Sequence, residues 1–281
     1  MRTNTYLPWI SLLLPACLHI PVAHADMPIF DTHLHYSNQD AEAIRPSDFI
    51  HIMDLNHITR AVVTGTPNTH TTSLYLASPS RIVPFLGVYQ TPDDKERWHQ
   101  DVALPVRVKR QLESGYWAGI GELHLFARNR DSPVFKDLIQ LARDRNLILL
   151  MHCDPAVIDS LFQQNPDARV IWAHAGAYPY PPLLNDYLAR YPNLSIDLSV
   201  RDELIAPGGK LGSEWEELLL DNSDRFMVGV DTYSPVRWSH YNDVVQRIRT
   251  WLTQLPEDVA TRLAYRNAEH LFGPAGNRVS P

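Results

Sequence analysis

The sequence predicts an α/β fold, namely a single (β/α)8 TIM barrel with an extra C-terminal helix. Eight short apolar runs recur along the 281 residues, and helical segments separate most of them. This alternation is typical of parallel βαβ units. Eight such units in a chain of this length favour a closed barrel over an open sheet. The runs are nearly all apolar, as expected for strands that are buried on both faces.

The predicted elements follow one another in a regular order. The strands are expected at residues 29–35, 61–65, 82–89, 119–126, 147–152, 170–174, 194–198 and 226–231. Apolar residues at helical spacing predict helices at 47–56, 134–145, 155–164, 182–190, 213–221, 238–255 and 256–272. The last helix ends at Gly273-Pro274, which is a stop signal. No glycine-rich phosphate loop follows the first strand, which disfavours a nucleotide-binding sheet.

The first 25 residues have the pattern of a secretory signal peptide. One early arginine precedes an apolar run, and small residues precede the expected cleavage after Ala25. We therefore expect an exported, periplasmic protein with a barrel domain over 26–281. A lipid anchor at Cys17 is the alternative. No later run reaches 18 apolar residues, so no integral membrane segment is expected in the mature chain.

Composition and charge exclude several classes of function. The 25 basic and 32 acidic residues give a net charge of −7. A nucleic-acid binder that works through bulk positive charge is therefore excluded. The apolar share of 44% is that of a globular chain. We expect a small-molecule substrate as the binding partner. The sequence leaves open whether the chain forms a homo-oligomer. The unusual count is that of histidine, with 13 residues.

Five ligand-type residues fall at the ends of predicted strands. His33 and His35 alternate on the first strand and therefore share a face. His152, His174 and Asp231 end the fifth, sixth and eighth strands. Each alone has an ordinary explanation, such as a hydrogen-bonded core histidine or a helix cap. Because the carboxyl ends of barrel strands surround one site, the five together predict a metal centre.

Three further residues are candidates for the same site. Glu122 and His124 share a face of the fourth strand. The carboxylate could bridge two ions or hold the attacking water, and His124 could contact the substrate or join the metal site. Arg201 follows the seventh strand and could bind a substrate carboxylate or phosphate. The alternative for Arg201 is a surface ion pair with Asp202 or Glu203.

Short motifs along the whole mature chain match those of a known superfamily. The matching strings are Asp31-Thr32-His33-Leu34-His35, Met151-His152-Cys153, Trp172-Ala173-His174-Ala175-Gly176, Gly229-Val230-Asp231-Thr232 and Tyr265-Arg266-Asn267-Ala268-Glu269-His270-Leu271-Phe272. With them the chain resembles the amidohydrolase superfamily, and within it the amidohydrolase-related (amidohydrolase 2-like) group that includes lactone hydrolases and decarboxylases. Gly119-Ile120-Gly121-Glu122 also resembles the fourth-strand glutamate motif of TatD-like hydrolases, which implies a two-metal site.

The resemblance implies a role for each candidate at the first ion. His33, His35 and Asp231 would hold a buried divalent metal, and Asp231 would also accept the proton of the attacking water. Mixed imidazole and carboxylate ligands suit zinc best, with manganese or iron as alternatives. A bound divalent ion lowers the pKa of water to about 7, which supplies a nucleophile at neutral pH.

The resemblance also implies a second group of residues beside the first ion. His152 and His174 would hold a second ion, or one would bind metal while the other polarises the substrate carbonyl. Glu122 would bridge if two ions are present. His174 is therefore both a candidate ligand and a candidate catalytic residue.

These residues lead to one main hypothesis about function and two alternatives. The first is a metal-dependent hydrolase in which a metal-bound water cleaves a C–O, C–N or P–O bond of a lactone, ester, amide or phosphoester. The second is a decarboxylase, in which the metal and Arg201 orient a substrate carboxylate. The third and weakest is a metal-binding barrel without catalysis.

Overall fold

The computed structural model describes residues 27–274 of the chain. The predicted signal peptide over residues 1–25 and the alternative lipid anchor at Cys17 lie outside the described residues. Among the described helices, none combines the length and the apolar character that crossing a membrane requires.

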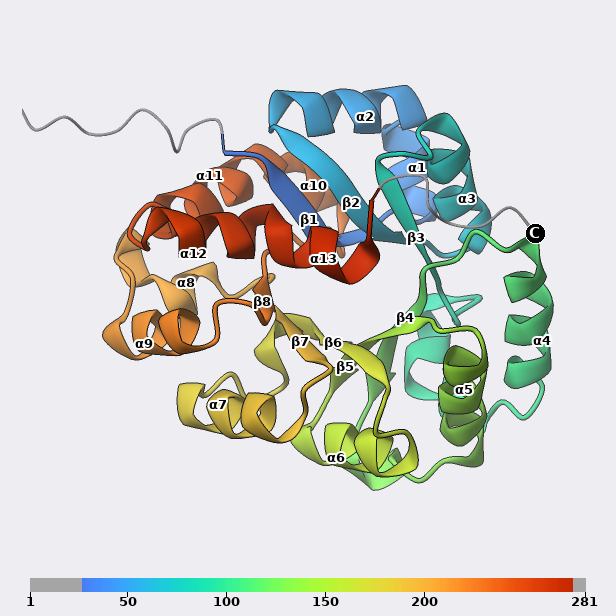
Figure 1. Ribbon diagram of the computed structural model, residues 1–281. Helices are drawn as coiled ribbons and strands as arrows, with labels where there is room; N and C mark the ends of the chain where they lie inside the picture. The colour runs from blue at the N-terminus through green and yellow to red at the C-terminus, as the bar shows by residue number, and fades with distance from the viewer. Residues whose placement is uncertain (1–26, 275–281) are drawn as a thin grey trace, which may run out of the picture.

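The core of the protein is an eight-stranded parallel barrel, as the sequence predicts (Figure 1). The strands pair in chain order and are β1 (Ile29–His35), β2 (Ile58–Thr64), β3 (Ile82–Leu86), β4 (Gly119–Leu125), β5 (Ile148–Cys153), β6 (Arg169–Trp172), β7 (Leu194–Asp197) and β8 (Phe226–Met227). Two backbone hydrogen bonds link the ends of the sheet. Thr32 N donates to Val228 O at 3.0 Å, and Asp231 N donates to His33 O at 2.7 Å. The segment after β8 therefore lies against β1 and nearly closes the barrel.

Helices surround the barrel on its outer face (Figure 1). They are α1 (Asn38–Ala43), α2 (Pro46–Leu55), α3 (Asn68–Ala77), α4 (Leu104–Gln111), α5 (Pro133–Asp144), α6 (Pro155–Gln164), α7 (Pro181–Arg190), α8 (Asp202–Ile205), α9 (Ser213–Asp221), α10 (Pro235–Ser239), α11 (Tyr241–Leu252), α12 (Glu257–Thr261) and α13 (Asn267–Phe272). In α5, Phe135, Leu138 and Ile139 lie at helical spacing and are buried. Such apolar faces hold the helices against the strands.

The extra C-terminal helix closes the amino-terminal end of the barrel. A π-helical stretch, Arg262–Arg266, joins α12 to α13. Phe272 at the end of α13 stacks on Phe30 with a centroid distance of 5.4 Å and meets Phe85 edge-on at 6.0 Å. The predicted final helix is therefore present, and it covers the amino-terminal end of the barrel.

Several boundaries differ from the prediction. The strand expected over 226–231 pairs only at Phe226–Met227, and the sixth strand ends at Trp172. His174 and Asp231 consequently lie in turns just beyond their strands. The helix expected over 238–255 is broken at His240 into α10 and α11. Four helices that the apolar spacing did not predict are α1, α3, α4 and α8.

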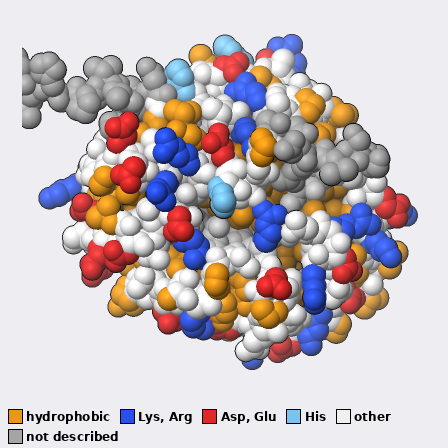
Figure 2. Space-filling model, in the orientation of Figure 1, with side chains coloured by type: hydrophobic (Ala, Val, Ile, Leu, Met, Phe, Trp, Pro, Cys, Tyr) orange, Lys and Arg blue, Asp and Glu red, His pale blue; other side chains and the backbone are white. Residues whose placement is uncertain are grey.

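Charges of both signs are interspersed over the face of the molecule seen in Figure 2. Lysine and arginine side chains alternate there with aspartate and glutamate, and apolar side chains are scattered among them. This face therefore presents a mixed, solvated surface.

Candidate metal centre and active site

Two imidazoles of β1 form the floor of the candidate site. His33 is 1% exposed, and its Nε2 lies 3.3 Å from Nε2 of His35. Two ring nitrogens at this distance point at a shared space. Thr232 fixes the end of the strand, since its Oγ1 accepts from His35 N at 2.9 Å and donates to His35 O at 2.7 Å.

Two carboxylates face the same space, Glu122 from β4 across the barrel and Asp231 from the segment after β8 beside β1. Asp231 Oδ1 lies 3.3 Å from His35 Nε2 and 3.8 Å from His33 Nε2. Glu122 Oε2 lies 3.4 Å from His35 Nε2, and its Oε1 lies 3.7 Å from His33 Nε2. Asp231 Oδ1 is buried and has no hydrogen-bond partner among the described residues. Such an oxygen is costly to bury unless a cation or a donor compensates it.

This donor set fits a divalent metal ion. Ligand atoms of a tetrahedral zinc site with bonds of about 2.0–2.2 Å are about 3.3–3.6 Å apart. The separations around His35 Nε2 are 3.3, 3.3 and 3.4 Å. Imidazole nitrogens and carboxylate oxygens are also the ligand types that zinc takes in catalytic sites. His33, His35, Glu122 and Asp231 therefore could hold the first ion.

A second group shares Glu122 with the first. Glu122 Oε1 lies 2.9 Å from His152 Nδ1 and 3.0 Å from His174 Nε2. On its other oxygen, Oε2 lies 3.5 Å from His124 Nε2. His152 and His124 stack with a centroid distance of 4.2 Å. The structure thus gathers all six predicted ligand residues, with Glu122 between the two groups.

The charges of the site support one another. Burial of Glu122 would raise the pKa of its carboxyl, but the surrounding imidazoles outweigh burial and hold that pKa well below its ordinary value. Burial acts on Asp231 in the same direction, and His33 and His35 nevertheless lower its pKa to about 2. Both carboxyls therefore stay ionised at neutral pH.

The backbone is strained at two of the site residues. His174 and Asp231 have φ angles of +59° and +56°, in the left-handed region that residues with a side chain avoid. Such conformations cost of order 1–3 kcal/mol and cluster at functional sites. Here the turns after β6 and β8 bring His174 Nε2 and Asp231 Oδ2 to 3.8 Å from each other.

The mouth of the site lies beside His152 and His124. The side chain of His152 is 37% exposed, compared with 17% for His124 and 3% for Glu122. Tyr89 holds His124 from behind, because its hydroxyl accepts from His124 N at 2.8 Å and lies 3.0 Å from His124 Nδ1. The free edge of His124, at Nε2, consequently faces Glu122.

Arg201 is half-buried and contacts the backbone after β6. Its Nε donates to His174 O at 2.7 Å, and its Nη2 donates to Gly176 O at 3.1 Å. The guanidinium therefore supports the turn that carries His174. Neither sequence-based hypothesis included these backbone contacts, and the substrate clamp by Arg201 stays a prediction.

Asp197 is a site residue that the sequence did not single out. It ends β7, is fully buried, and its Oδ2 accepts from His33 Nδ1 at 2.7 Å. Its position at the carboxyl end of a strand was the available signal, because His174 and Asp231 follow their strands in the same way.

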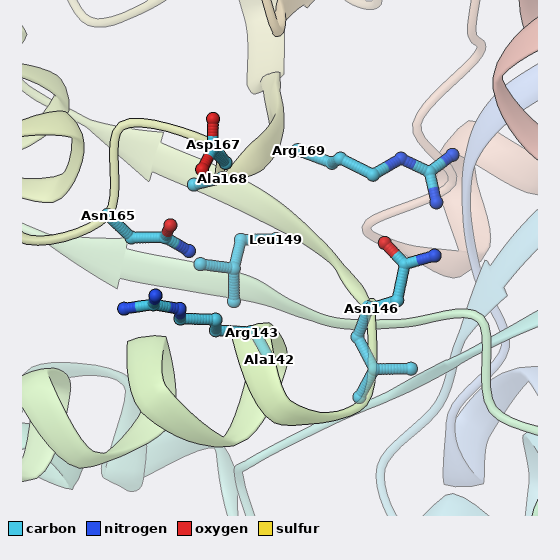
Figure 3. A pocket seen from close by; sticks show the side chains of 9 residues that line it. Ala142, Arg143, Asn146, Leu149, Asn165, Asp167, Ala168 and Arg169 are labelled. Carbon is cyan, nitrogen blue, oxygen red and sulfur yellow. The ribbon is translucent and has the colours of Figure 1, made fainter.

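A separate polar pocket of about 140 Å³ lies at the other end of the barrel (Figure 3). Arg143, Asn165 and Asp167 line it beside the first residues of β5 and β6. None of the six candidate ligands lines this pocket.

A family model described as amidohydrolase matches residues 30–273. The chain belongs to the amidohydrolase family. The match spans all eight strands and the C-terminal helix. No curated protein matches the chain in sequence.

Solved structures with the same fold include hydrolases and a decarboxylase. A probable 2-pyrone-4,6-dicarboxylic acid hydrolase from Acinetobacter baumannii, with citric acid bound, has 18% identity and a TM-score of 0.61 over 88% of this chain and 100% of its own. An amidohydrolase from Burkholderia multivorans with bound zinc has 14% identity and a TM-score of 0.59 over 88% and 99%. The 5-carboxyvanillate decarboxylase LigW from Sphingomonas paucimobilis has 17% identity and a TM-score of 0.56 over 89% and 100%. At these identities the likeness shows the fold alone.

Proposed function

We propose that the chain is a metal-dependent hydrolase that cleaves a C–O, C–N or P–O bond of a small molecule such as a lactone, ester, amide or phosphoester. The observation that carries the proposal is the set of ring nitrogens and carboxylate oxygens around one centre, which includes a buried Asp231 oxygen without a partner among the described residues. A divalent cation compensates such a set. Zinc suits these ligands best, with manganese or iron as alternatives.

Each residue of the chain has a defined task in this proposal. When bound, the divalent ion lowers the pKa of water and polarises a carbonyl or phosphoryl oxygen. Asp231 would accept the proton of the attacking water on the carboxylate oxygen that does not bind the ion, and return it to the leaving group. Glu122, His152 and His174 hold a second ion, or orient the substrate if one ion is present.

Hydrolysis is favoured over decarboxylation by the contacts of Arg201. The decarboxylase hypothesis assigns this side chain to a substrate carboxylate. In the structure its Nε and Nη2 donate to the backbone oxygens of His174 and Gly176. Two of the N–H donors of Arg201 are therefore already used by the backbone, which weakens the case for a bidentate substrate clamp.

The test is a substrate screen with the zinc- or manganese-loaded full chain. Lactones, esters, amides, phosphoesters and aromatic carboxylic acids are each incubated with wild type, with His33→Ala and with His152→Ala. We expect metal-dependent hydrolysis of one class by wild type, and loss of turnover in both variants while their circular dichroism stays unchanged. His240→Ala is the matched control, because this histidine lies on the surface with its side chain 59% exposed.

Two outcomes would contradict the proposal. The first is carbon dioxide release from an acid without hydrolysis of any other class, which would identify a decarboxylase. The second is activity that follows only the folded fraction in the two variants, which would make these histidines structural.

A further inference from the structure

We propose that Asp197 is a positioning residue that aligns two candidate metal-binding imidazoles, His33 directly and His174 through Ser199. This inference rests on the proposed function and adds to it a residue outside the predicted site. Asp197, Ser199 and His33 are all 1% exposed or less, so no solvent competes for their contacts. The inference concerns which ring nitrogen of each imidazole is left to face the cation.

The direct contact fixes the ring of His33. Asp197 Oδ2 lies 2.7 Å from His33 Nδ1. A carboxylate can only accept, so Nδ1 carries the hydrogen. The lone pair of a neutral ring is therefore at Nε2, the nitrogen that faces His35, Glu122 and Asp231. A carboxylate behind a metal-binding histidine fixes the ring and raises its basicity.

The indirect contact has the same consequence for His174. Ser199 Oγ lies 2.6 Å from Asp197 Oδ2 and must donate its one hydrogen to that carboxylate. The same Oγ lies 2.8 Å from His174 Nδ1 and can therefore only accept there. The Ser199 carbonyl, an obligatory acceptor, lies 3.4 Å from the same nitrogen. His174 thus also carries its hydrogen at Nδ1 and turns Nε2 to Glu122.

The backbone holds the carboxylate in place. Ser199 N donates to Asp197 Oδ1 at 2.9 Å, which occupies the second oxygen. Gly229 lets the segment after β8 approach closely, because a Cβ there would lie 2.7 Å from Asp197 Oδ1 and 2.9 Å from His33 Cβ. Asp197 is therefore enclosed by β1, β7 and the chain after β8, with little freedom to move away from either imidazole.

The test uses the full chain with Asp197→Asn, Ser199→Ala and a matched control. An asparagine offers only one accepting atom, so it cannot replace both carboxylate oxygens. Ser199→Ala removes only the relay to His174. Asp202→Asn is the control, because Asp202 is a buried carboxylate of the same region that hydrogen-bonds Trp251 Nε1 and no imidazole.

Two readouts are measured, zinc affinity by chelator competition and the imidazole Nδ1–H resonances by ¹⁵N-histidine NMR. We expect Asp197→Asn to weaken zinc binding about 10–100-fold and to shift the Nδ1–H signals of both His33 and His174. Ser199→Ala should shift the His174 signal most and weaken zinc binding less than Asp197→Asn. Asp202→Asn should leave both readouts as in wild type.

The outcomes separate this inference from the proposed function. Wild type that binds none of zinc, manganese and iron but shows both protected Nδ1–H signals, with the expected shifts in the variants, would contradict the hydrolase and support the positioning role. Wild-type zinc affinity and unshifted signals in a folded Asp197→Asn would overturn the positioning role. If that variant does not fold, an unshifted His174 signal in Ser199→Ala overturns it.

Discussion

At the amino-terminal end of the barrel, buried or half-buried arginines donate to backbone carbonyls, whereas at the carboxyl-terminal end ring nitrogens and carboxylate oxygens face one another. Arg249 donates to Met27 O and Asn56 O, each at 2.9 Å, and Arg225 Nε donates to Leu194 O at 2.9 Å. The arginine side chains thus provide positively charged donors to the backbone carbonyl oxygens of the amino-terminal end, which is called the lower end below. At the carboxyl-terminal end, called the upper end below, Asp231 Oδ1 has no hydrogen-bond partner among the described residues.

This difference indicates that the amino-terminal end contributes mainly to stability and the carboxyl-terminal end mainly to function. The arginine contacts of the lower end hold the starts of the strands together, while at the upper end a bound cation would compensate a buried carboxylate oxygen that has no hydrogen-bond partner among the described residues. Changes at the upper end should therefore alter metal binding and turnover more than folding. Changes at the lower end should do the reverse.

The largest expected effect is that of Asp231→Asn. Removing the charge of this buried carboxylate takes away a ligand and the proton acceptor, and we expect turnover to fall by about 10²–10⁴-fold. The metal-free variant should lose about 2 kcal/mol in the free energy of unfolding at pH 7, because His33 and His35 hold the pKa of this carboxyl at about 2 and the amide has no such charge. A variant that keeps most of its turnover would remove Asp231 from the chemistry.

The second prediction concerns added zinc. A ligand at a thousand times its Kd stabilises the folded state by about 4 kcal/mol. We expect thermal unfolding of the metal-free wild type to move to higher temperature with zinc, and this shift to be much smaller in Asp231→Asn. Equal shifts in both proteins would place the zinc elsewhere.

The third prediction tests the lower end with Arg249→Met. Two backbone oxygens lose their buried donor, at a cost of about 2–3 kcal/mol in the free energy of unfolding. Zinc affinity and turnover per folded molecule should stay at the wild-type level. A loss of zinc affinity as large as that of Asp231→Asn would contradict the separation of the two ends.

The smallest expected effect is that of Tyr89→Phe. The substitution removes one hydroxyl that holds His124, which corresponds to about 1 kcal/mol or roughly a fivefold loss of turnover. Zinc affinity should change less than twofold if His124 contacts the substrate. A tenfold loss of zinc affinity would instead make His124 a metal-site residue.

Much of this architecture was predictable because it depends on repeating local patterns. Apolar runs alternating with helical segments predicted the barrel, and the strand-end positions of His33, His152 and Glu122 placed them at one end. The short β8 escaped prediction, since the chain after Met227 is apolar and lies against β1 but lacks the regular pairing of a strand. The spacing of apolar residues alone does not show at which residue the pairing of β8 with its neighbour ends.

The contacts of Asp197 and Arg201 were beyond sequence patterns for a different reason. Both lie near the end of β7, and a carboxylate or a guanidinium there is compatible with several partners. Which partner each takes depends on the approach of β1 and on the turn after β6, both distant in sequence. Such pairings are set by the closed barrel and not by local spacing.

The central claim is most directly tested by a crystal structure of zinc-loaded protein with anomalous scattering measured at the zinc edge. The account predicts an anomalous peak within about 2.0–2.3 Å of His33 Nε2, His35 Nε2 and an Asp231 oxygen. A crystal grown in excess zinc with no peak at that centre, and with these side chains still facing one another, would contradict it.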